Sequence, residues 1–245
     1  MNEVITLLKS HRSIRKFTDQ PVPQAVMDEV VLAGQHAATS SFIQACTVVQ
    51  VDDPDIRETL MACSGGQAYV GAAPRFLVFC ADMKRHQMAC DMHEQTMMSG
   101  YTEQFLTASL DCGLFSQNVV IAAESLGLGC VYIGGLRNKI EEVAEALNLP
   151  ELVYPVFGLC LGYPDQDPEV KPRLPLSVVL KHNTYDDSND EAVIAEYDQH
   201  VREYYATRTG GNKEMTWSEQ VSGMLVKEAR PHMMPFLQKK GFLKK

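Results

Sequence analysis

Apolar and polar positions follow one another along the chain with the spacing of helices in some stretches and of strands in others. Apolar residues recur at helical spacing near residues 4–8, 24–38, 53–63, 137–147, from 190 onward, and 216–229. Continuous apolar or β-branched runs predict buried strands at residues 47–51, 76–80, 130–133 and 153–162. The mixture of both kinds of element predicts an α+β protein.

The most apolar part of the chain is predicted to form one long helix over residues 102–126. Apolar side chains lie on nearly all of its faces, which is typical of a buried helix. Polar residues interrupt it too often for a membrane span, at Glu103, Asp111, Asn118 and Glu124. We therefore expect this helix at the centre of the core or of a dimer interface, and we expect no membrane association.

The C-terminal part of the chain is charged and helical, and a Thr-Gly-Gly-Asn sequence at 209–212 interrupts it. The sequence contains no internal repeat, no low-complexity tract and no linker that would separate independent domains. We therefore expect a single domain over residues 1–245. Residues from about 182 onward are expected to form a helical extension that wraps the core or a partner subunit.

Charge and cysteine content narrow the possible functions. The formal net charge of −9 argues against a nucleic-acid-binding protein, because such binding is driven by neutralisation of phosphates. The seven cysteines are odd in number, lack Cys-x-x-Cys spacing and lie mostly in apolar runs, which indicates reduced, buried thiols of a cytoplasmic protein. No signal-peptide pattern is expected, since Glu3 comes early and no apolar run follows.

A cluster of basic residues stands out against this acidic composition. It is the sequence His11-Arg12-Ser13-Ile14-Arg15-Lys16-Phe17, which follows the first predicted helix. Arg12 and Arg15 are three positions apart and could face one anionic ligand, and a guanidinium group matches two phosphate oxygens at once. The ordinary alternative is a solvated basic turn.

A glycine-rich segment after the long helix has the appearance of a dinucleotide-binding motif. Gly127 and Gly129 match the start of G-x-G-x-x-G, but Tyr132 occupies the third glycine position. The order of the flanking elements is also reversed. Here a helix precedes the glycines and a strand follows them, whereas the dinucleotide-binding turn runs from a strand to a helix. We therefore interpret Gly127 as a helix C-cap, and the pair Gly134-Gly135 as a place where the backbone can approach a flat ligand closely.

Residues 83–101 are rich in Met, His and Gln, and their structure is hard to predict. His86, Cys90 and His93 fall at helical spacing, which would suit a metal ion. No fourth ligand is evident, so we expect no metal site and regard a Met-rich surface segment as the simpler interpretation.

Taken together, several segments closely resemble the oxygen-insensitive NADPH nitroreductases and the related NADPH–flavin oxidoreductases, within the nitroreductase superfamily. The matching motifs run in order along nearly the whole chain: H-R-S-I-R-K-F (11–17), S-F-I-Q (41–44), G-G-Q (65–67), A-A-E-S-L-G-L-G (122–129), V-Y-I-G-G-L-R-N (131–138), F-G-L-C-L-G (157–162), K-P-R-L-P (171–175), R-x-Y-Y-x-x-R (202–208) and K-E-x-R-P (227–231). Two departures are small: Thr39 replaces a more usual serine, and residues 83–101 are slightly longer than expected.

The resemblance implies a nitroreductase-like α+β fold, with helices around a central, mostly antiparallel sheet, and non-covalent FMN bound at a homodimer interface. By motif match, the FMN site would include His11, Arg12, Ser13, Ile14, Arg15, Thr39, Gln67, Tyr132, Ile133, Gly134, Gly135, Lys171 and Arg173. His11, Arg12 and Arg173 would hold the phosphate. Arg15 and Lys171 would lie toward the pyrimidine edge of the flavin. The substrate and NADPH region would include Ser41, Phe42, Arg208 and Arg230.

The resemblance also implies the reaction. A hydride would pass from NADPH to N5 of FMN in a ping-pong cycle, and nitro compounds or quinones would then be reduced by two electrons. No side chain would act as a nucleophile or general base. Two alternatives remain at this point: a reductase that supplies reduced FMN to a partner enzyme, and a non-enzymatic flavoprotein. For Arg208, the alternative to a role in NADPH binding is an ordinary helix-terminal cation that offsets the macrodipole.

Overall fold

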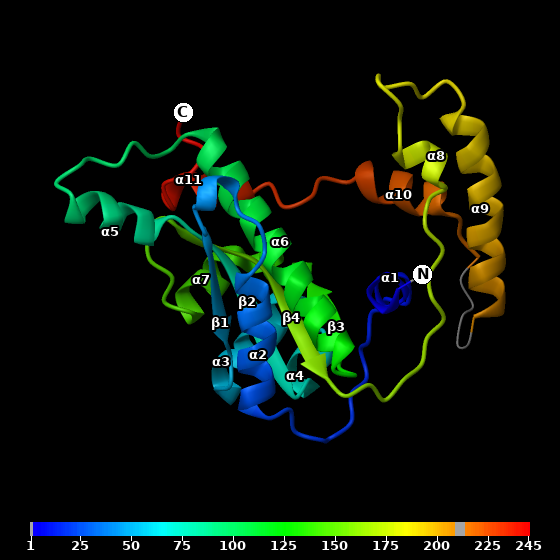
Figure 1. Ribbon diagram of the computed structural model, residues 1–245, viewed down its shortest axis with the longest axis horizontal. Helices are drawn as coiled ribbons and strands as arrows, with labels where there is room; N and C mark the ends of the chain where they lie inside the picture. Colours follow the sequence, from blue (N-terminus) through cyan, green and yellow to red (C-terminus); the bar gives the residue numbers. More distant parts are fainter. Residues whose placement is uncertain (1, 209–213) are drawn as a thin grey trace. The chain divides into compact units, whose positions relative to one another are not determined.

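The structure, a computed structural model, describes residues 2–208 and 214–245 (Figure 1). The chain divides into two compact units. The first unit comprises Met1–Asp167 with Arg230–Lys245, and the second comprises Pro168–Ala229. The interruption predicted at 209–212 lies outside the described residues.

A four-stranded antiparallel sheet forms the centre of the first unit, and its order is β1-β2-β4-β3. Its strands are β1 (Cys46–Gln50), β2 (Arg75–Asp82), β3 (Gly129–Ile133) and β4 (Val153–Gly162). All four predicted strands are therefore present, and the α+β prediction with an antiparallel sheet is confirmed. β2 is longer than the predicted 76–80 because its ladder with β4 continues from Arg75 opposite Leu161 to Asp82 opposite Val153.

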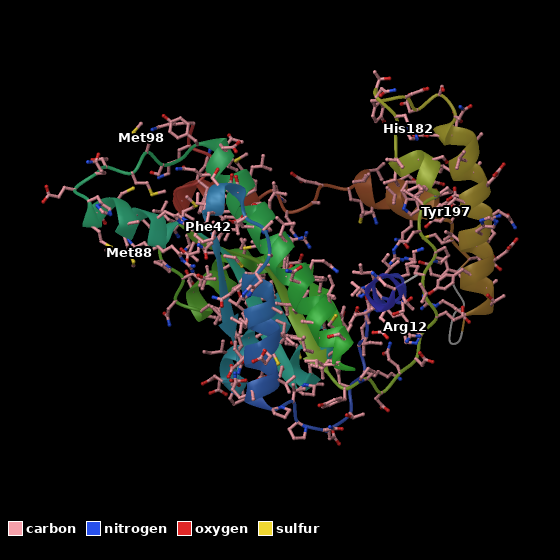
Figure 2. All side chains as sticks on the ribbon, viewed as in Figure 1. Arg12, Phe42, Met88, Met98, His182 and Tyr197 are labelled. Atoms are coloured by element: carbon pink, nitrogen blue, oxygen red, sulfur yellow. The ribbon has the colours of Figure 1, made fainter. Side chains whose placement is uncertain are left out.

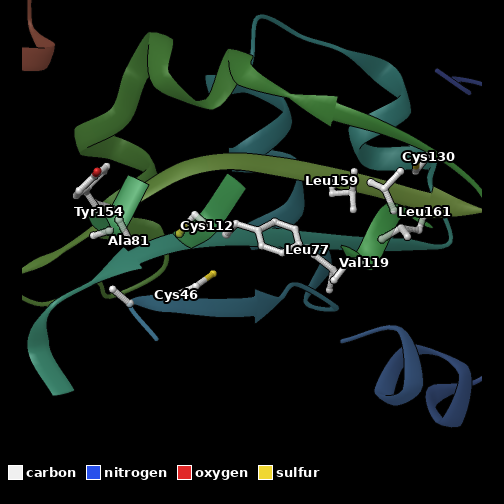
Figure 3. Close-up of a cluster of buried hydrophobic side chains, with 14 of the residues drawn as sticks. Cys46, Leu77, Ala81, Cys112, Val119, Cys130, Tyr154, Leu159 and Leu161 are labelled. Carbon is white, nitrogen blue, oxygen red and sulfur yellow. The ribbon is translucent and has the colours of Figure 1, made fainter. Parts of the chain in front are cut away.

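Helices cover both faces of this sheet, so side chains that alternate along β2 enter two different cores. Leu77, Phe79 and Ala81 belong to one cluster, which includes residues of α2 (Gln24–Gln35) and α6 (Thr102–Ser125) (Figure 3). The intervening Phe76, Val78 and Cys80 belong to the other. That second cluster includes residues of α3 (Pro54–Cys63), α4 (Ala68–Ala72), η2 (Gly134–Lys139) and α7 (Ile140–Ala146).

The long helix α6 matches its predicted span but is buried on only part of its surface. Ala108, Cys112 and Val119 are fully buried against the sheet. Leu106, Leu110 and Leu114 form an exposed stripe at i, i+4 and i+8, with 49%, 57% and 49% of their surfaces exposed. By length and mean hydropathy (1.3) α6 is able to cross a membrane, a test that core helices of soluble proteins also pass. Its packing against the sheet makes it a core helix here.

Several short elements differ from the sequence prediction. The remaining helices are α1 (Glu3–Lys9), η1 (Ser40–Phe42), α5 (Lys84–Met92), α8 (Leu176–Val179), α9 (Asp190–Thr207), α10 (Trp217–Leu225) and α11 (Met233–Lys239). Of these, α5, α8 and α11, together with α4, are not predicted by periodicity. α4 and α8 have only five and four residues, too few for a helical repeat to be recognised. α2 ends before the predicted residue 38 because His36 and Ala37 form tighter i→i+3 hydrogen bonds to Ala33 and Gly34.

The second unit is built around α9, whose Tyr197, Val201 and Tyr205 are buried together. Trp217 of α10 packs against them. α10 begins with a capping box between Thr216 and Glu219, and it ends at Leu225, before the predicted residue 229.

All seven cysteines of the chain are free thiols, as predicted, and six of them are buried. The exception is Cys90 on α5, which is partly exposed. Burial raises the pKa of the buried thiols Cys63, Cys80, Cys112, Cys130 and Cys160, the last to about 12.

Candidate functional site

The basic segment 11–17 is extended and lies against the ends of β3 and β4. The backbone amide of Ile14 donates to the carbonyl oxygen of Cys130 at 2.8 Å, and that of Thr18 donates to Tyr163 at 2.9 Å. The Ile14 side chain is buried and touches Gly129, where a Cβ atom would lie 2.5 Å from Ile14 Cγ1. Ile14 therefore anchors the segment, and a contribution of Ile14 to a ligand would come from its backbone.

His11 is oriented by an acidic residue that the sequence analysis did not assign to the site. Nδ1 of His11 donates to Oε1 of Glu124 on α6 at 2.6 Å. Because the carboxylate only accepts, Nδ1 carries the proton and Nε2 is the nitrogen available to a ligand.

The same two residues belong to the only group of metal-ligand atoms that the described residues bring within 4.8 Å of one another, which is completed by Cys130. The buried Cys130 thiol has a raised pKa, because burial and the nearby Glu124 disfavour the thiolate that a metal would need. The trio weighed in the sequence analysis, His86, Cys90 and His93, is not such a group. Nε2 of His86 lies 2.5 Å from the carbonyl oxygen of Ile43.

The arginines of the segment make different contacts. Nη1 of Arg12 (labelled in Figure 2) forms an ion pair with Oδ1 of Asp167 at 2.7 Å. Both side chains are accessible to solvent. Nη1 of Arg15 donates to the carbonyl oxygen of Ser13 at 3.4 Å. A guanidinium group carries several N–H donors in one plane, a geometry that suits an anion.

Three separate loops meet beside η2. Gly135 lies so close to the loop after α3 that a Cβ atom would be 2.7 Å from the carbonyl oxygen of Ser64. Nε of Arg230 donates to Oδ1 of Asn138 at 2.9 Å. The structure therefore brings Gly134-Gly135, the loop that leads to Gln67, and Arg230 into one region, although they are far apart in sequence.

Tyr132 and Ile133 point their side chains into the protein. The Tyr132 hydroxyl donates to Oγ of Ser116 on α6 at 3.0 Å, and Ile133 is 1% exposed. Burial raises the pKa of Tyr132 to about 12, although the hydrogen bond with Ser116 acts in the opposite direction. A ligand at this position would therefore meet their backbone.

A strained loop connects α2 to β1 and contains Ser41 and Phe42, both predicted to border the substrate. Ser41, Phe42 and Gln44 have φ values of 47°, 58° and 53°, in the left-handed region that favours glycine. Each such residue costs on the order of 1–3 kcal/mol, and such strain is concentrated at functional sites. Phe42 is 83% exposed, which is unusual for a phenylalanine (Figure 2).

Two of the predicted ligand-binding side chains have buried oxygens without a hydrogen-bond partner among the residues that the structure describes. They are Oγ1 of Thr39 and Oε1 of Gln67. An unpaired buried polar atom is costly, so each needs a partner beyond those that residues 2–208 and 214–245 supply. A bound ligand is the partner expected at these two positions.

The predicted cations of the second unit gather around aromatic rings. Nζ of Lys171 lies 5.4 Å from the centre of the Tyr205 ring, and the Arg208 guanidinium carbon lies at the same distance from that ring. Nη1 of Arg173 donates to the carbonyl oxygen of Lys171 at 2.6 Å. Lys171 and Arg208, 37 positions apart in sequence, thus contact the same aromatic ring.

Sequence reasoning missed the residues that position others: Glu124, Asp111 and Asn138. Glu124 and Asn138 lie inside motifs quoted above, and Asp111 interrupts an apolar helix. An acidic side chain on the buried face of a helix was the available signal, because a buried carboxylate needs partners. We interpreted it only as evidence against a membrane span.

Comparison with known proteins gives matches over nearly the whole chain. The profile of the nitroreductase family matches residues 8–163, and the profile of its C-terminal domain matches residues 171–245. The chain is 45% identical to an NADPH-flavin oxidoreductase of Vibrio harveyi over 245 residues, which is 100% of both chains. It is 44% identical to an oxygen-insensitive NADPH nitroreductase of Salmonella typhimurium over 242 residues, 99% of each.

The fold is similar to that of solved structures. The structure of the Vibrio harveyi NADPH:FMN oxidoreductase complexed with NAD⁺ superposes with a TM-score of 0.91 at 43% identity. The match covers 100% of both chains. This agreement extends over both units of the present structure.

The raised pKa of the Tyr132 hydroxyl predicts that the stability of the folded protein falls between pH 10 and 12. Its pKa is raised from 10 to about 12 in the folded protein, so its contribution to stability is complete below pH 10 and is lost as the pH rises toward 12. Tyr132→Phe should cost about 1 kcal/mol at pH 7, for the lost hydrogen bond, and should lose less stability than wild type between pH 10 and 12. Urea unfolding at pH 7 and 11 measures both quantities. Tyr185→Phe, at an 81% exposed position, is the control and should change neither.

Proposed function

Since the chain belongs to the nitroreductase family, we propose that it uses FMN to reduce nitro compounds and quinones by two electrons, with NADPH as the preferred reductant. It is an NADPH-dependent oxidoreductase with FMN as its cofactor. The observation that carries this conclusion is the full-length similarity to an NADPH-flavin oxidoreductase and to an NADPH nitroreductase.

The chain's own residues fit an FMN molecule. We assign the phosphate to His11 and Arg12, with Arg173, because their donors suit a dianion. Arg15 and Lys171 are assigned to the pyrimidine edge, and Ser13 to the same segment. The unpaired oxygens of Thr39 and Gln67 are available to the flavin, and the close packing of Gly135 on Ser64 supports a backbone surface for a flat ring at Tyr132, Ile133, Gly134 and Gly135.

When bound, FMN accepts a hydride from NADPH and delivers two electrons to an acceptor. The protein binds and orients both partners. The cations at Arg15 and Lys171 stabilise negative charge on the flavin ring, where preorganised charge is most effective. Ser41, Phe42 and Arg230 are assigned to the acceptor face, and Arg208 to the 2′-phosphate of NADPH. No nucleophilic side chain is required.

A second candidate function is the supply of reduced FMN to a partner enzyme. It is favoured by the similarity to the NADPH-flavin oxidoreductase of Vibrio harveyi. The two activities share the same site, so the difference lies in the preferred acceptor. Turnover of free FMN well above that of nitrofurazone and quinones would favour this alternative.

We also propose that the protein is a cytoplasmic homodimer. The apolar stripe Leu106, Leu110 and Leu114 on α6 is exposed in the chain, and a second copy would bury it. Residues from about 182 onward are proposed to wrap the core or the partner subunit. The seven free thiols support a reducing compartment.

The cofactor assignment predicts a yellow protein that releases FMN on heating or acidification, and it predicts NADPH oxidation with nitro compounds. Arg12→Ala should weaken FMN binding by ~1.5–3 kcal/mol, the value of a hydrogen bond to a charged group. Flavin fluorescence titration of the apoprotein measures this loss. Lys16→Ala removes a neighbouring exposed cation and should bind FMN as wild type does. Release of FAD, or FMN binding without NADPH oxidation by any acceptor, would contradict the proposed function.

If Arg208 binds the 2′-phosphate, its removal should weaken the binding of NADPH but not that of NADH. Arg208→Ala should raise the Michaelis constant for NADPH on the order of ten- to a hundredfold, because a charged contact to the 2′-phosphate is lost. NADH lacks this phosphate, so its constant should hardly change. Steady-state kinetics with both nucleotides test this, with Arg202→Ala on the same helix as the control. Equal losses with NADPH and NADH would leave only the role of a helix-terminal cation.

The dimer predicts a mass of about twice 27.3 kDa in sedimentation equilibrium. Leu110→Glu places a charge in the apolar stripe and should shift the protein toward monomers. Leu32→Glu, at a 46% exposed position on α2, is the matched control. A monomeric wild-type protein would overturn the proposal.

A further inference from the structure

Side chains from two helices hold the strained loop that carries Phe42. We propose that Asp111 of α6 and Arg85 and His86 of α5 are positioning residues that set acceptor specificity by fixing the place of Phe42. This inference rests on the proposed function, in which Phe42 borders the acceptor. It also assigns a role to the Met- and His-rich segment 83–101, which family resemblance leaves unexplained.

Asp111 holds the loop at both of its ends. Its Oδ1 accepts the backbone amide of Ser40 at 3.3 Å, and its Oδ2 accepts that of Ala45 at 2.9 Å. The three residues with positive φ, Ser41, Phe42 and Gln44, all lie between these two amides. Asp111 is 2% exposed, so its carboxylate has little water to bind and depends on these amides.

Side chains of α5 donate hydrogen bonds to the backbone carbonyl oxygens of the loop. Nε2 of His86 donates to the carbonyl oxygen of Ile43 at 2.5 Å. Arg85 donates to the carbonyl oxygens of Gln44 at 3.4 Å and Cys46 at 3.3 Å. An ion pair with Asp82 at 3.2 Å orients Arg85. Acceptors and donors of the loop backbone are thus both fixed, the donors by α6 and the acceptors by α5.

Phe42 itself makes little contact with the rest of the chain, since 83% of its surface is exposed. The position of its ring is therefore decided by the loop backbone. Behind the loop lies a cavity of about 40 Å³ lined by Thr39, Gln44, Cys46, Arg85, Asp111 and Phe115, among others. Because the loop has room to relax and three unfavourable φ values to relieve, it needs the contacts from both helices to keep its form.

The test uses the FMN-loaded protein and two acceptors of different size, nitrofurazone and p-benzoquinone. His86→Leu and Arg85→Met should change the ratio of kcat/KM for these acceptors on the order of tenfold, because small displacements of a positioning group change rates strongly. FMN content should stay at the wild-type value. His86→Gln, whose amide can donate to Ile43, should restore much of the wild-type ratio. His93→Leu, at the exposed C-cap residue of α5, is the control and should leave the ratio unchanged.

A double-mutant cycle separates positioning from general stability. If the α5 residues act through Phe42, His86→Leu should have no further effect on the ratio in a Phe42→Ala background. An equal effect with and without Phe42, or an unchanged ratio in both α5 variants, would overturn the inference. Asp111→Asn is the third variant, and the two α5 variants remain decisive if it fails to fold. A wild-type protein without NADPH-dependent reductase activity would instead refute the proposed function, so the two failures are distinguishable.

Discussion

The burial of both faces of the sheet is the constraint on which the rest of the structure depends. Because helices cover both sides, β2 and β4 must be apolar on both faces, and few polar groups can lie along the strands. Functional groups are thereby restricted to strand ends, helix ends and connecting loops. The segment at His11, the turn at Gly134-Gly135 and the loop of Phe42 all occupy such positions.

The central helix carries the few charges that this arrangement admits. Asp111 and Glu124 both lie on α6, and each faces a segment distant in sequence, the Phe42 loop for Asp111 and His11 for Glu124. A buried carboxylate needs donors, so each acid forces a loop to present them. One helix that packs as core thus also arranges two parts of the site.

The sequence allowed the fold to be predicted well, because the strands and long helices have strong periodicity. All four strands were predicted, and the span of α6 was correct to one residue. The helices α5 and α11 were missed, because α5 is rich in charged and polar residues and α11 contains Pro235. The motifs predict which residues belong to the candidate site. They could not indicate Asp111 or His86, because these residues contact backbone atoms, and such contacts place no requirement on the sequence of the partner.

The burial of the cysteines affects how the protein withstands electrophilic acceptors. Quinones are electrophiles that alkylate thiolates, and thiolates, not thiols, are the reactive form. An enzyme that binds such compounds at every turnover risks covalent self-inactivation. Here six thiols are withdrawn from solvent, and burial raises the pKa of five of them, so their nucleophilic form is scarce. The core that stabilises the sheet therefore also protects these thiols from electrophilic compounds such as quinones, and it leaves Cys90 as the site where a maleimide or a fluorescent label would attach.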